Sequence, residues 1–484
     1  MINRGSGVFC NISSLPSEYA IGGFGKECRE FLDQLVSMKM KWWQILPLCP
    51  VGYGNSPYSS MSAFAINPYY IDLPSLVEDG LLTEQEVCEA RYEGKPYAVD
   101  YDWVRENKPR WIKKAFSRFT KKEKLAQFAK QEAAWLDDYA AFMASKEANG
   151  GTAFWEWTRK PATEQMEYYI FEQYLAHTQW AAVKHYANER GISLFGDMPI
   201  YVLHDSADFW GNRELFLTDE KGIPNQVAGV PPDYFAEEGQ LWGNPLYDWK
   251  AMECEGYKWW LRRIEKNLKL YDAVRIDHFR GLYQYWAIPA EAKTAKAGHW
   301  QDGPGMKLID KIRMHFDAPN IIAEDLGEYS EGLAQFLKDA NFPGMRVMQF
   351  GFSGYENMHT PHRYSEHVVA YTGTHDNDTL LGWLWATPME EKLRMLRYCR
   401  YFGDNWGEGG PNSEVIRAVI TTLWQSGALL AFVPVQDLCG FGTDTRMNIP
   451  GKADHNWEFR VTKEALAHID TGFYRKLNET YARG

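Results

Sequence analysis

The sequence predicts an α/β fold, a closed (β/α)8 barrel with inserted subdomains. Eight short apolar or β-branched runs are present, and most are separated by helix-like segments, which is typical of parallel strands joined by crossover helices. Eight such units favour a closed barrel over an open sheet, and 484 residues fit one barrel with insertions. We therefore expect residues 1–484 to form a single catalytic barrel. The runs are residues 7–12, 42–48, 192–202, 273–276, 321–323, 345–350, 368–372 and 429–433.

Helical periodicity fills the gaps between these runs. Apolar residues at spacings of three and four positions predict one apolar helix face after the first run and another before the third. Residues 306–316 and 331–340 predict two later helices. The residues that define the first two faces are Cys28, Phe31, Leu32, Leu35 and Met38, and then Phe171, Tyr174, Leu175, Ala181 and Ala182.

Two long segments interrupt the alternation of strands and helices. Residues 76–160 include a Lys-rich, Trp-containing stretch and predict a helical insertion. Residues 203–257 are rich in Gly, Pro, Asn and Trp and predict a loop-rich insertion over the active site. Ordered segments of this length are usually functional.

The composition narrows the class of protein. The net charge is −12 and no block of Lys and Arg is long enough to follow a phosphate backbone, so we expect no nucleic-acid partner. No apolar stretch approaches the length of a membrane span, and the first eight residues carry no long apolar run. We therefore expect no membrane association, no signal peptide and a cytoplasmic location.

Neither a metal nor a cofactor is indicated by the motifs. The seven cysteines form no C-x-x-C pair, and there is no H-x-x-x-H spacing. The stretch Asp376-Asn377-Asp378 resembles the start of a calcium loop but lacks the later Gly and Glu. A Ser-His-Asp enzyme is poorly supported because G-x-S-x-G is absent.

Aromatic residues are unusually abundant, with 20 Trp, 28 Tyr and 25 Phe. Many Trp residues stand beside Gly, Asn, Asp or Gln, as in residues 240–244. A Trp in a loop has a flat apolar face that suits the C–H face of a sugar ring, although packing is the default role for most of them.

The fourth predicted strand ends in a charged pair. Side chains alternate along a strand, so Arg275 and Asp277 share one face while Val274 and Ile276 share the other. If the apolar pair faces the helices, the charged pair points into the barrel mouth. An adjacent Arg keeps a carboxylate ionised, as a nucleophile requires.

Three further strands also end in acidic residues. Glu324 follows the apolar residues 321–323, where desolvation raises a carboxyl pKa and favours a proton donor. His375 and Asp376 follow residues 368–372 and are candidates for binding sugar hydroxyls, and Asp197 is a weaker candidate. Taken alone, each acid is equally consistent with a residue that caps the following helix. Together they mark the end of the barrel where such enzymes place catalysis.

Two carboxylates flanking a bond are the arrangement for glycoside cleavage. In retaining enzymes one carboxylate attacks the anomeric carbon and the other protonates the leaving oxygen. The resulting glycosyl-enzyme passes to water or to a sugar hydroxyl, and the residues alone leave both outcomes open.

Seven segments of the sequence resemble motifs of glycoside hydrolase family 77, the amylomaltases and disproportionating enzymes. They occur in the order of the family between residues 7 and 455, so the resemblance covers nearly the whole chain. The segments are residues 54–58, 196–201, 240–244, 274–281, 323–327, 373–379 and 446–451.

This resemblance implies a barrel related to the α-amylases but without their C-terminal β-domain. It implies that Asp277 is the nucleophile, Glu324 the general acid/base and Asp376 a stabiliser of the distorted sugar. Among the substrate-binding residues that it implies, Arg275 and His375 support the reacting glucose. The other six are Tyr58, Ser56, Asp197, Gln240, Trp242 and Asn448, with Gln240 and Trp242 on a loop that covers the cleft.

The activity that the resemblance implies is 4-alpha-glucanotransferase, the transfer of an α-1,4-glucan segment to the 4-hydroxyl of an acceptor. The partners expected are maltooligosaccharides and α-1,4-glucans, with no cofactor; the oligomeric state stays open. An α-amylase-type hydrolase is the alternative enzyme. A non-catalytic glucan-binding protein is a third hypothesis, which the intact set of acids disfavours.

Overall fold

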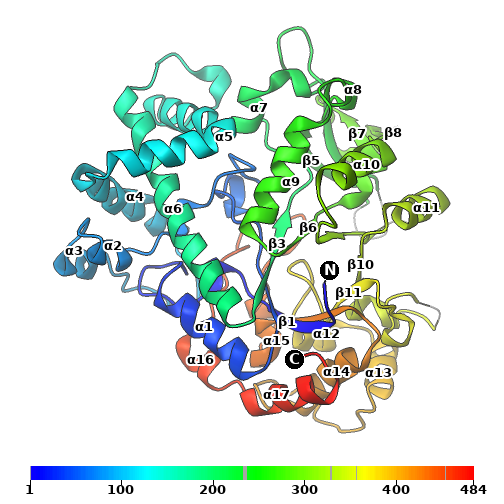
Figure 1. Cartoon of the computed structure of the whole chain (residues 1–484). Coiled ribbons are helices and arrows are strands. Elements are labelled where there is room, and N and C mark those ends of the chain that lie inside the picture. Colours follow the sequence, from blue (N-terminus) through cyan, green and yellow to red (C-terminus); the bar gives the residue numbers. More distant parts are fainter. Residues whose placement is uncertain (1, 233–236, 328–329, 356, 453) are drawn as a thin grey trace.

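Eight parallel strands form the centre of the molecule and curve into a barrel (Figure 1). The computed structural model describes residues 2–232, 237–327, 330–355, 357–452 and 454–484. The strand order is β10-β11-β12-β1-β2-β3-β6-β9, and the Ala323 amide donates to the Pro343 carbonyl (2.9 Å) where the two ends of the sheet meet. The strands are β1 (Gly5–Phe9), β2 (Trp42–Gln44), β3 (Ser193–Met198), β6 (Ala273–Ile276), β9 (Ile321–Ala323), β10 (Gly344–Val347), β11 (Val368–Tyr371) and β12 (Leu430–Pro434).

The predicted (β/α)8 barrel is confirmed, and each of the eight predicted runs overlaps one of these strands. Some runs extend past the strand. The run at 42–48 continues beyond β2 because Ile45, Leu46 and Leu48 stay buried in the loop above it. Hydrophobicity therefore located the strands, while the hydrogen bonds to neighbouring strands set their ends.

The interior of the barrel is filled by side chains that point inward from alternate positions. Successive residues of a strand face opposite sides, so Ala273 lies inside while Val274 and Ile276 pack against the helices. Gly7 faces the interior beside Phe432, where an added Cβ would approach the phenyl ring to 2.3 Å. The inner cluster consists of Trp42, Phe195, Ala273, Ile322, Met345, Val369, Tyr371, Leu430 and Phe432.

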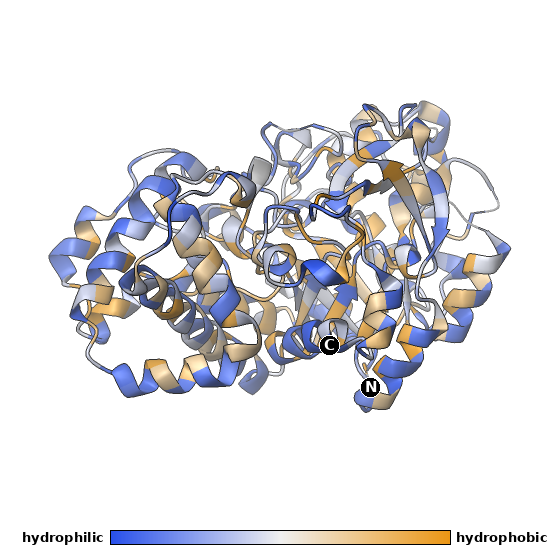
Figure 2. Ribbon diagram, turned by 90° about the horizontal axis from the view of Figure 1, so that it is seen from above, coloured by the Kyte–Doolittle hydropathy of each residue, from blue (hydrophilic) through white to orange (hydrophobic). Residues whose placement is uncertain are grey.

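Amphipathic helices surround the barrel and bury their apolar faces against it (Figure 2). The predicted helices are present: the first apolar face belongs to α1, the second to α6, and residues 306–316 and 331–340 contain α10 and α11. The second face is corrected in one respect, because Ala181 and Ala182 are exposed and the buried side of α6 continues through Trp180 and Val183. The helices that flank the strands are α1 (Lys26–Ser37), α6 (Thr163–Glu189), α9 (Lys258–Leu270), α10 (Met306–His315), α11 (Glu331–Ala340), α12 (Leu380–Ala386), α13 (Met389–Tyr398) and α14 (Glu414–Gln425).

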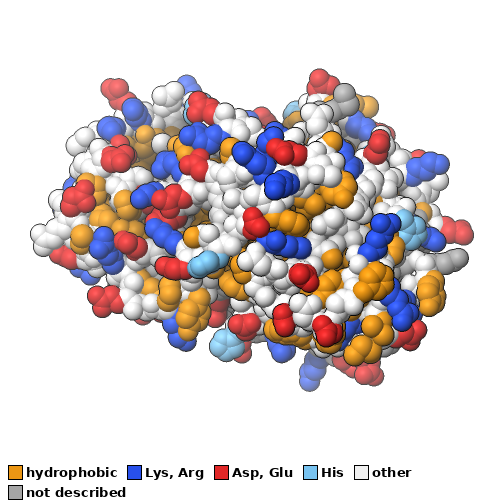
Figure 3. Space-filling model, turned by 90° about the horizontal axis from the view of Figure 1, so that it is seen from below, with side chains coloured by type: hydrophobic (Ala, Val, Ile, Leu, Met, Phe, Trp, Pro, Cys, Tyr) orange, Lys and Arg blue, Asp and Glu red, His pale blue; other side chains and the backbone are white. Residues whose placement is uncertain are grey.

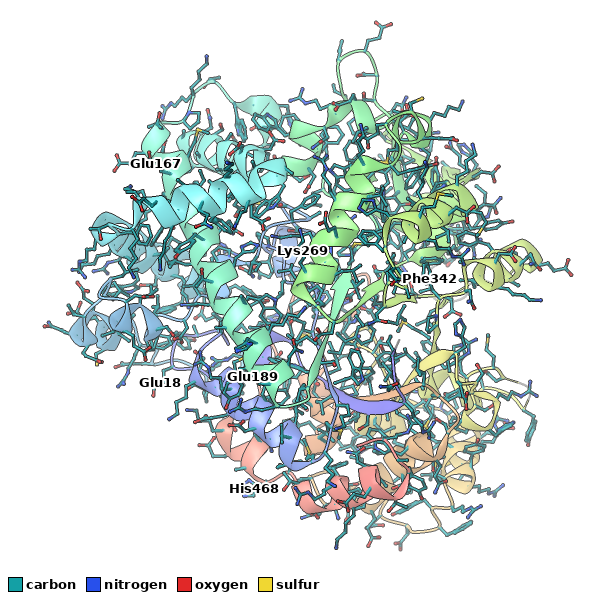
Figure 4. The ribbon with its side chains drawn as sticks, in the orientation of Figure 1. Glu18, Glu167, Glu189, Lys269, Phe342 and His468 are labelled. Atoms are coloured by element: carbon teal, nitrogen blue, oxygen red, sulfur yellow. The ribbon has the colours of Figure 1, made fainter. Side chains whose placement is uncertain are left out.

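A helical layer stands to one side of the barrel, between β2 and β3 (Figure 1). The long helix α6 joins this layer to the barrel, with Glu167 near one end and Glu189 at the other (Figure 4). Lys266 of α9 forms an ion pair with Glu132 of α5 (2.7 Å) and ties the layer to a barrel helix. Its helices are α2 (Ser75–Glu78), α3 (Glu84–Glu89), α4 (Tyr101–Arg118) and α5 (Lys122–Ala148).

A second, antiparallel sheet was not predicted. Residues 203–257 were expected to be loop-rich, but they contain β4 (Gln226–Val230) and β5 (Gln240–Pro245), besides α7 (Ala207–Gly211) and α8 (Trp249–Cys254). These strands pair with β7 (Gln284–Pro289) and β8 (His299–Asp302) in the order β5-β4-β7-β8. β4 pairs with β5 inside the insertion, but the two strands that complete the sheet, β7 and β8, lie beyond β6 in the sequence. Residues 233–236 of this expected insertion lie outside the described residues.

After β12 the described chain folds back onto the barrel as α15 (Val435–Cys439), α16 (Lys463–Ala467) and α17 (Thr471–Thr480), without a β-domain. Both charge signs are interspersed on the face drawn in Figure 3. In the part of the chain that the structure describes, no helix combines the length and apolarity needed to cross a membrane.

Candidate active site

The predicted acids gather at the carboxyl ends of the barrel strands. Asp277 directly follows β6 and Glu324 directly follows β9, and the last paired residues of these strands are Ile276 and Ala323. Asp277 and Glu324 are therefore the next pair in the register of two adjacent parallel strands. Neighbouring strands lie about 4.8 Å apart, so the two carboxyl groups share one rim of the barrel.

Arg275 binds two carboxylates at once. Its Nε and Nη2 donate to Asp197 (3.0 and 2.8 Å), and Nη2 also donates to Asp277 Oδ1 (2.8 Å). The Tyr58 hydroxyl donates to Asp197 Oδ2 (2.6 Å). Arg275 and Asp197 are buried, whereas the Asp277 side chain is 30% exposed. The bidentate pair thus fixes Arg275, which in turn holds Asp277 at the cleft surface.

Glu324 is held by two backbone amides. The amides of His278 and Leu326 donate to its two carboxylate oxygens, each at 2.8 Å. His278 has a φ of 51°, in the left-handed region that a His rarely adopts, and this conformation belongs to the turn that presents its amide. Behind the turn, Phe279 packs edge-on against Phe342 (5.9 Å), which is labelled in Figure 4.

The two carboxyl groups differ in their surroundings. Burial, reinforced by the negative charge of Asp277, raises the pKa of Glu324 to about 8. Burial also raises the pKa of Asp277, to about 7, against the opposing charge of Arg275. Arg275 alone was expected to govern Asp277, so desolvation by the barrel is a correction to that expectation. Of the two carboxyl groups, Glu324 has the higher pKa, so a proton held by the pair favours Glu324.

Asp376 and His375 follow β11, at the same rim of the barrel as Asp277 and Glu324. Asn448 donates to Asp376 Oδ1 (2.6 Å), and the Arg446 guanidinium donates to the Asp376 carbonyl. His375 is buried and its ring stacks on Tyr58, with centroids 5.1 Å apart and an angle of 18°. These contacts join the strand end to the loop that contains Asn448, and they leave the Asp376 side chain 49% exposed.

A cavity of about 460 Å³ opens between these residues. Asp277 and Asp376 line it, whereas Glu324 is only 8% exposed. Gln240 and Trp242 were expected on a covering loop, but they lie on β5 of the antiparallel sheet. Of the eleven predicted site residues, eight line the cavity: Ser56, Tyr58, Gln240, Trp242, Asp277, His375, Asp376 and Asn448. The other three, Asp197, Arg275 and Glu324, are buried beside them.

Sequence reasoning missed several residues of the wall. Trp457 lines the cavity, lies 5.8 Å from the Tyr58 ring and 5.9 Å from that of His375, and has a φ of 66°. It follows the motif at 446–451 closely, and an aromatic residue so near a candidate motif was the available signal. Seven other cavity residues lie within the motifs named above but were not singled out as site residues: Gly54, Pro199, Ile200, Tyr201, Asn244, Pro450 and Gly451. Ser59, Lys452 and Asn456 lie outside those motifs and were missed.

The described residues include no cluster of three or more His, Cys, Asp or Glu side chains that could hold a metal ion. They bring together two neighbouring carboxyl groups, of which Glu324 is buried and Asp277 is partly exposed. The cavity is also lined by a third carboxylate, Asp376, and by aromatic rings. This arrangement suits acid/base and nucleophilic chemistry on a glycoside.

Comparison with known proteins agrees with this chemistry. The family model for 4-alpha-glucanotransferase, glycoside hydrolase family 77, matches residues 10–466. A 4-alpha-glucanotransferase of Thermus thermophilus is 43% identical, and one of Streptococcus pneumoniae is 40% identical, each over 99% of both chains. The amylomaltase from Streptococcus agalactiae in complex with acarbose is 37% identical, with a TM-score of 0.94 over 99% of this chain and 100% of that one. The chain therefore belongs to the 4-alpha-glucanotransferase family, glycoside hydrolase family 77.

Proposed function

We propose that this 4-alpha-glucanotransferase works by double displacement, with Asp277 as nucleophile and Glu324 as general acid/base. In the first step an Asp277 oxygen bonds to the anomeric carbon while the bond to the 4-oxygen of the leaving glucan breaks. The proton of Glu324 passes to that leaving oxygen. The donor glucan is then held as a covalent ester on Asp277.

In the second step the 4-hydroxyl of an acceptor glucan or glucose attacks the same anomeric carbon. Its proton passes to Glu324, and the Asp277 carboxylate is released. Two inversions give net retention, so an α-1,4 bond is broken and an α-1,4 bond is made. Atoms and charge balance without a cofactor.

The observation that supports this assignment most strongly is the difference between two neighbouring carboxyl groups. Glu324 is buried, accepts only backbone amides and has the higher pKa, so it suits the acid. Asp277 is cleft-facing and bonded to Arg275, so it suits the nucleophile.

The remaining site residues take supporting roles in this proposal. Asp376 and His375 hold hydroxyls of the reacting glucose, with Asn448 orienting Asp376. Asp197 and Tyr58 hold Arg275 in place, and Ser56 borders the donor site. Gln240 and Trp242 of β5 form the wall that limits water.

Transfer rather than hydrolysis requires that an acceptor hydroxyl outcompetes water. The alternative, an α-amylase-type hydrolase, would use the same two carboxylates. Trp242 favours transfer, because its indole lines the cavity, packs edge-on against the His278 ring (4.8 Å) and donates to Gln240 (3.1 Å). An aromatic wall at this point excludes water and offers a surface for an acceptor sugar.

Incubation with maltotriose tests the proposal directly. Transfer produces glucose together with a ladder of longer oligomers, while the total number of reducing ends stays constant. A steady rise in reducing ends, without longer products, would identify a hydrolase instead. Trapping the ester in a Glu324→Gln variant with an activated maltosyl donor, followed by mass spectrometry of the peptide that contains Asp277, tests the nucleophile.

Three broader assignments belong to the same proposal. The substrates are maltooligosaccharides and α-1,4-glucans, and the enzyme acts in the cytoplasm. Residues 1–484 act as one catalytic unit in which residues 76–160 and 203–257 are insertions into the barrel. Fractionation of the native cells and limited proteolysis of the purified chain check the location and the single unit.

A further inference from the structure

Trp155 presents an aromatic ring to solvent from the segment between α5 and α6. The residue is 55% exposed, although the rings of Phe142 and Phe209 close to it are fully buried. Exposing this much apolar surface costs free energy that a packed position would recover. The neighbouring Trp157 is only half-buried as well, and it donates from its indole nitrogen to the Thr152 carbonyl (2.9 Å).

The exposed indole rests on a rigid support. Its ring stacks on His204 with centroids 4.4 Å apart and an angle of 19°. The other contacts of His204 are edge-on, with Phe209 at 4.7 Å and with Phe154 at 5.6 Å. One indole face is therefore covered by the imidazole, and the exposed surface belongs to the opposite face. Burial lowers the pKa of His204, which favours the neutral form of the supporting ring.

The segment around Trp155 is held in place by hydrogen bonds and by ring packing. Asn149 at the end of α5 accepts from the amides of Thr158 (3.0 Å) and Arg159 (2.9 Å), closing the segment on itself. The amide of Phe154 donates to Asp205 (3.2 Å), and its ring packs on Phe209 of α7, the short helix beside this segment in Figure 1. A ring held this way loses little conformational entropy when a ligand stacks on it.

The support of Trp155 is continuous with the wall of the active-site cavity. Residues 199–201 line the cavity, and His204 follows three positions later in the same segment. Leu203 lies against Gly52, whose added Cβ would be 3.1 Å from the Leu203 side chain. Gly52 belongs to residues 51–60, a turn that supplies several residues of the opposite wall. Trp155 is thus joined to the cavity wall through His204, which lies in the same continuous segment as residues 199–201.

We propose that Trp155, stacked on His204, is an accessory binding platform for a glucose unit of an α-1,4-glucan whose reacting end occupies the cavity. This inference rests on the proposed function for the identity of the ligand. The flat apolar face of the indole matches the C–H face of glucose, and the neutral imidazole stiffens it from behind. The platform then selects for long glucans and contributes nothing to short ones.

Binding is measured by calorimetry on the full chain in a Glu324→Gln background, which prevents turnover. Maltoheptaose and maltotriose are the two probes. Adding Trp155→Ala is expected to weaken maltoheptaose binding at least fivefold and to leave maltotriose binding unchanged. Trp155→Tyr, which keeps an aromatic face, is expected to restore most of the affinity. Equal affinities of the Trp155→Ala and parent chains for maltoheptaose would overturn the platform.

Trp385→Ala is the matched control. Trp385 is 49% exposed on α12, and its indole nitrogen donates to the Gly407 carbonyl (3.0 Å), but it is not stacked along the cleft wall. It is expected to leave both affinities unchanged, and an equal loss there would overturn a specific role for Trp155. Melting temperatures of all variants establish that the chain is folded. Since the binding measurement needs no turnover, its result is separate from the maltotriose product ladder that tests the proposed mechanism.

Discussion

The barrel interior contains two regions that the same strands build with opposite chemistry. In the lower region Phe195, Ala273 and Ile322 are fully buried and apolar. Two residues further along the same three strands stand Asp197, Arg275 and Glu324, all buried and ionisable. A separation of about 7 Å along each strand divides a packed core from a catalytic rim.

The comparison shows how the packed lower region, here called the floor of the barrel, changes the pKa of the carboxyl groups at the rim. Buried charges cost several kcal/mol unless they are paired, and here Arg275 pairs with Asp197 and Asp277. The apolar floor excludes water from below the rim, and this desolvation raises the pKa of Glu324. We expect that changes in the lower region affect stability and changes at the rim affect catalysis.

Glu324→Gln is the change with the largest expected effect on rate. Removing the general acid should lower kcat with maltooligosaccharides by roughly 10³- to 10⁴-fold, while the melting temperature changes little. Steady-state kinetics and a thermal melt check both parts. Glu331→Gln, at an exposed position in the first turn of α11, is the control and should retain full activity. Wild-type rates for Glu324→Gln would refute the assignment of the acid.

Phe432→Ala tests the floor of the barrel. Its ring contacts Phe195 (5.4 Å) and Tyr371 (5.6 Å) and is fully buried, so truncation leaves a cavity. The free energy of unfolding should fall by about 3–5 kcal/mol, measured by denaturant titration. Phe402→Ala, at a site that is 82% exposed, should change it by less than about 0.5 kcal/mol. Similar losses in the two variants would contradict the packed floor.

The pH dependence of kcat/KM sharpens the contrast between the two rim carboxyls. As the pH rises through the pKa of Glu324, about 8, the acid loses its proton and the rate should fall about tenfold per pH unit. As the pH falls through the pKa of Asp277, about 7, the nucleophile gains a proton and the rate falls again. We therefore expect a bell-shaped pH profile of kcat/KM, with its maximum between the pKa values of Asp277 and Glu324. A decline that begins above about pH 5 would show an ordinary carboxyl pKa for Glu324.

Tyr58→Phe has the smallest expected effect at the rim. It removes the hydrogen bond that Tyr58 donates to Asp197 and the longer one that it accepts from Arg275 (3.1 Å), while Asp197 keeps both bonds from Arg275. The loss of about 1 kcal/mol predicts a decrease in kcat/KM of roughly tenfold or less. Tyr186→Phe, which removes an exposed bond to Asp33, is the control and should have wild-type kinetics. A loss as large as that of Glu324→Gln would mean that Tyr58 takes part in the chemistry itself.

Much of this arrangement was predictable from local sequence. Alternation along β6 placed Arg275 and Asp277 on the inner face, because Val274 and Ile276 must face the helices. The apolar residues before Glu324 predicted its raised pKa by the same reasoning. These predictions succeeded because a strand end and its polar residue are adjacent in the chain.

Other features depended on residues far apart in the sequence. The antiparallel sheet pairs β4 with β7 across the barrel strand β6, so neither segment alone predicts a strand partner. Trp457 reaches Tyr58 only because the chain after β12 folds back over the barrel mouth. The stacking of Trp155 on His204 likewise joins the helical layer to the segment after β3.

By itself the sequence located the eight strands and the acidic residues that follow them, because hydrophobic periodicity and strand alternation act over a few neighbouring residues. Only the tertiary structure decided how those acids share protons, since a pKa depends on burial and on charges contributed by other strands. It also decided which aromatic rings face the cavity and which face solvent, because ring stacking requires partners that only the closed barrel brings together.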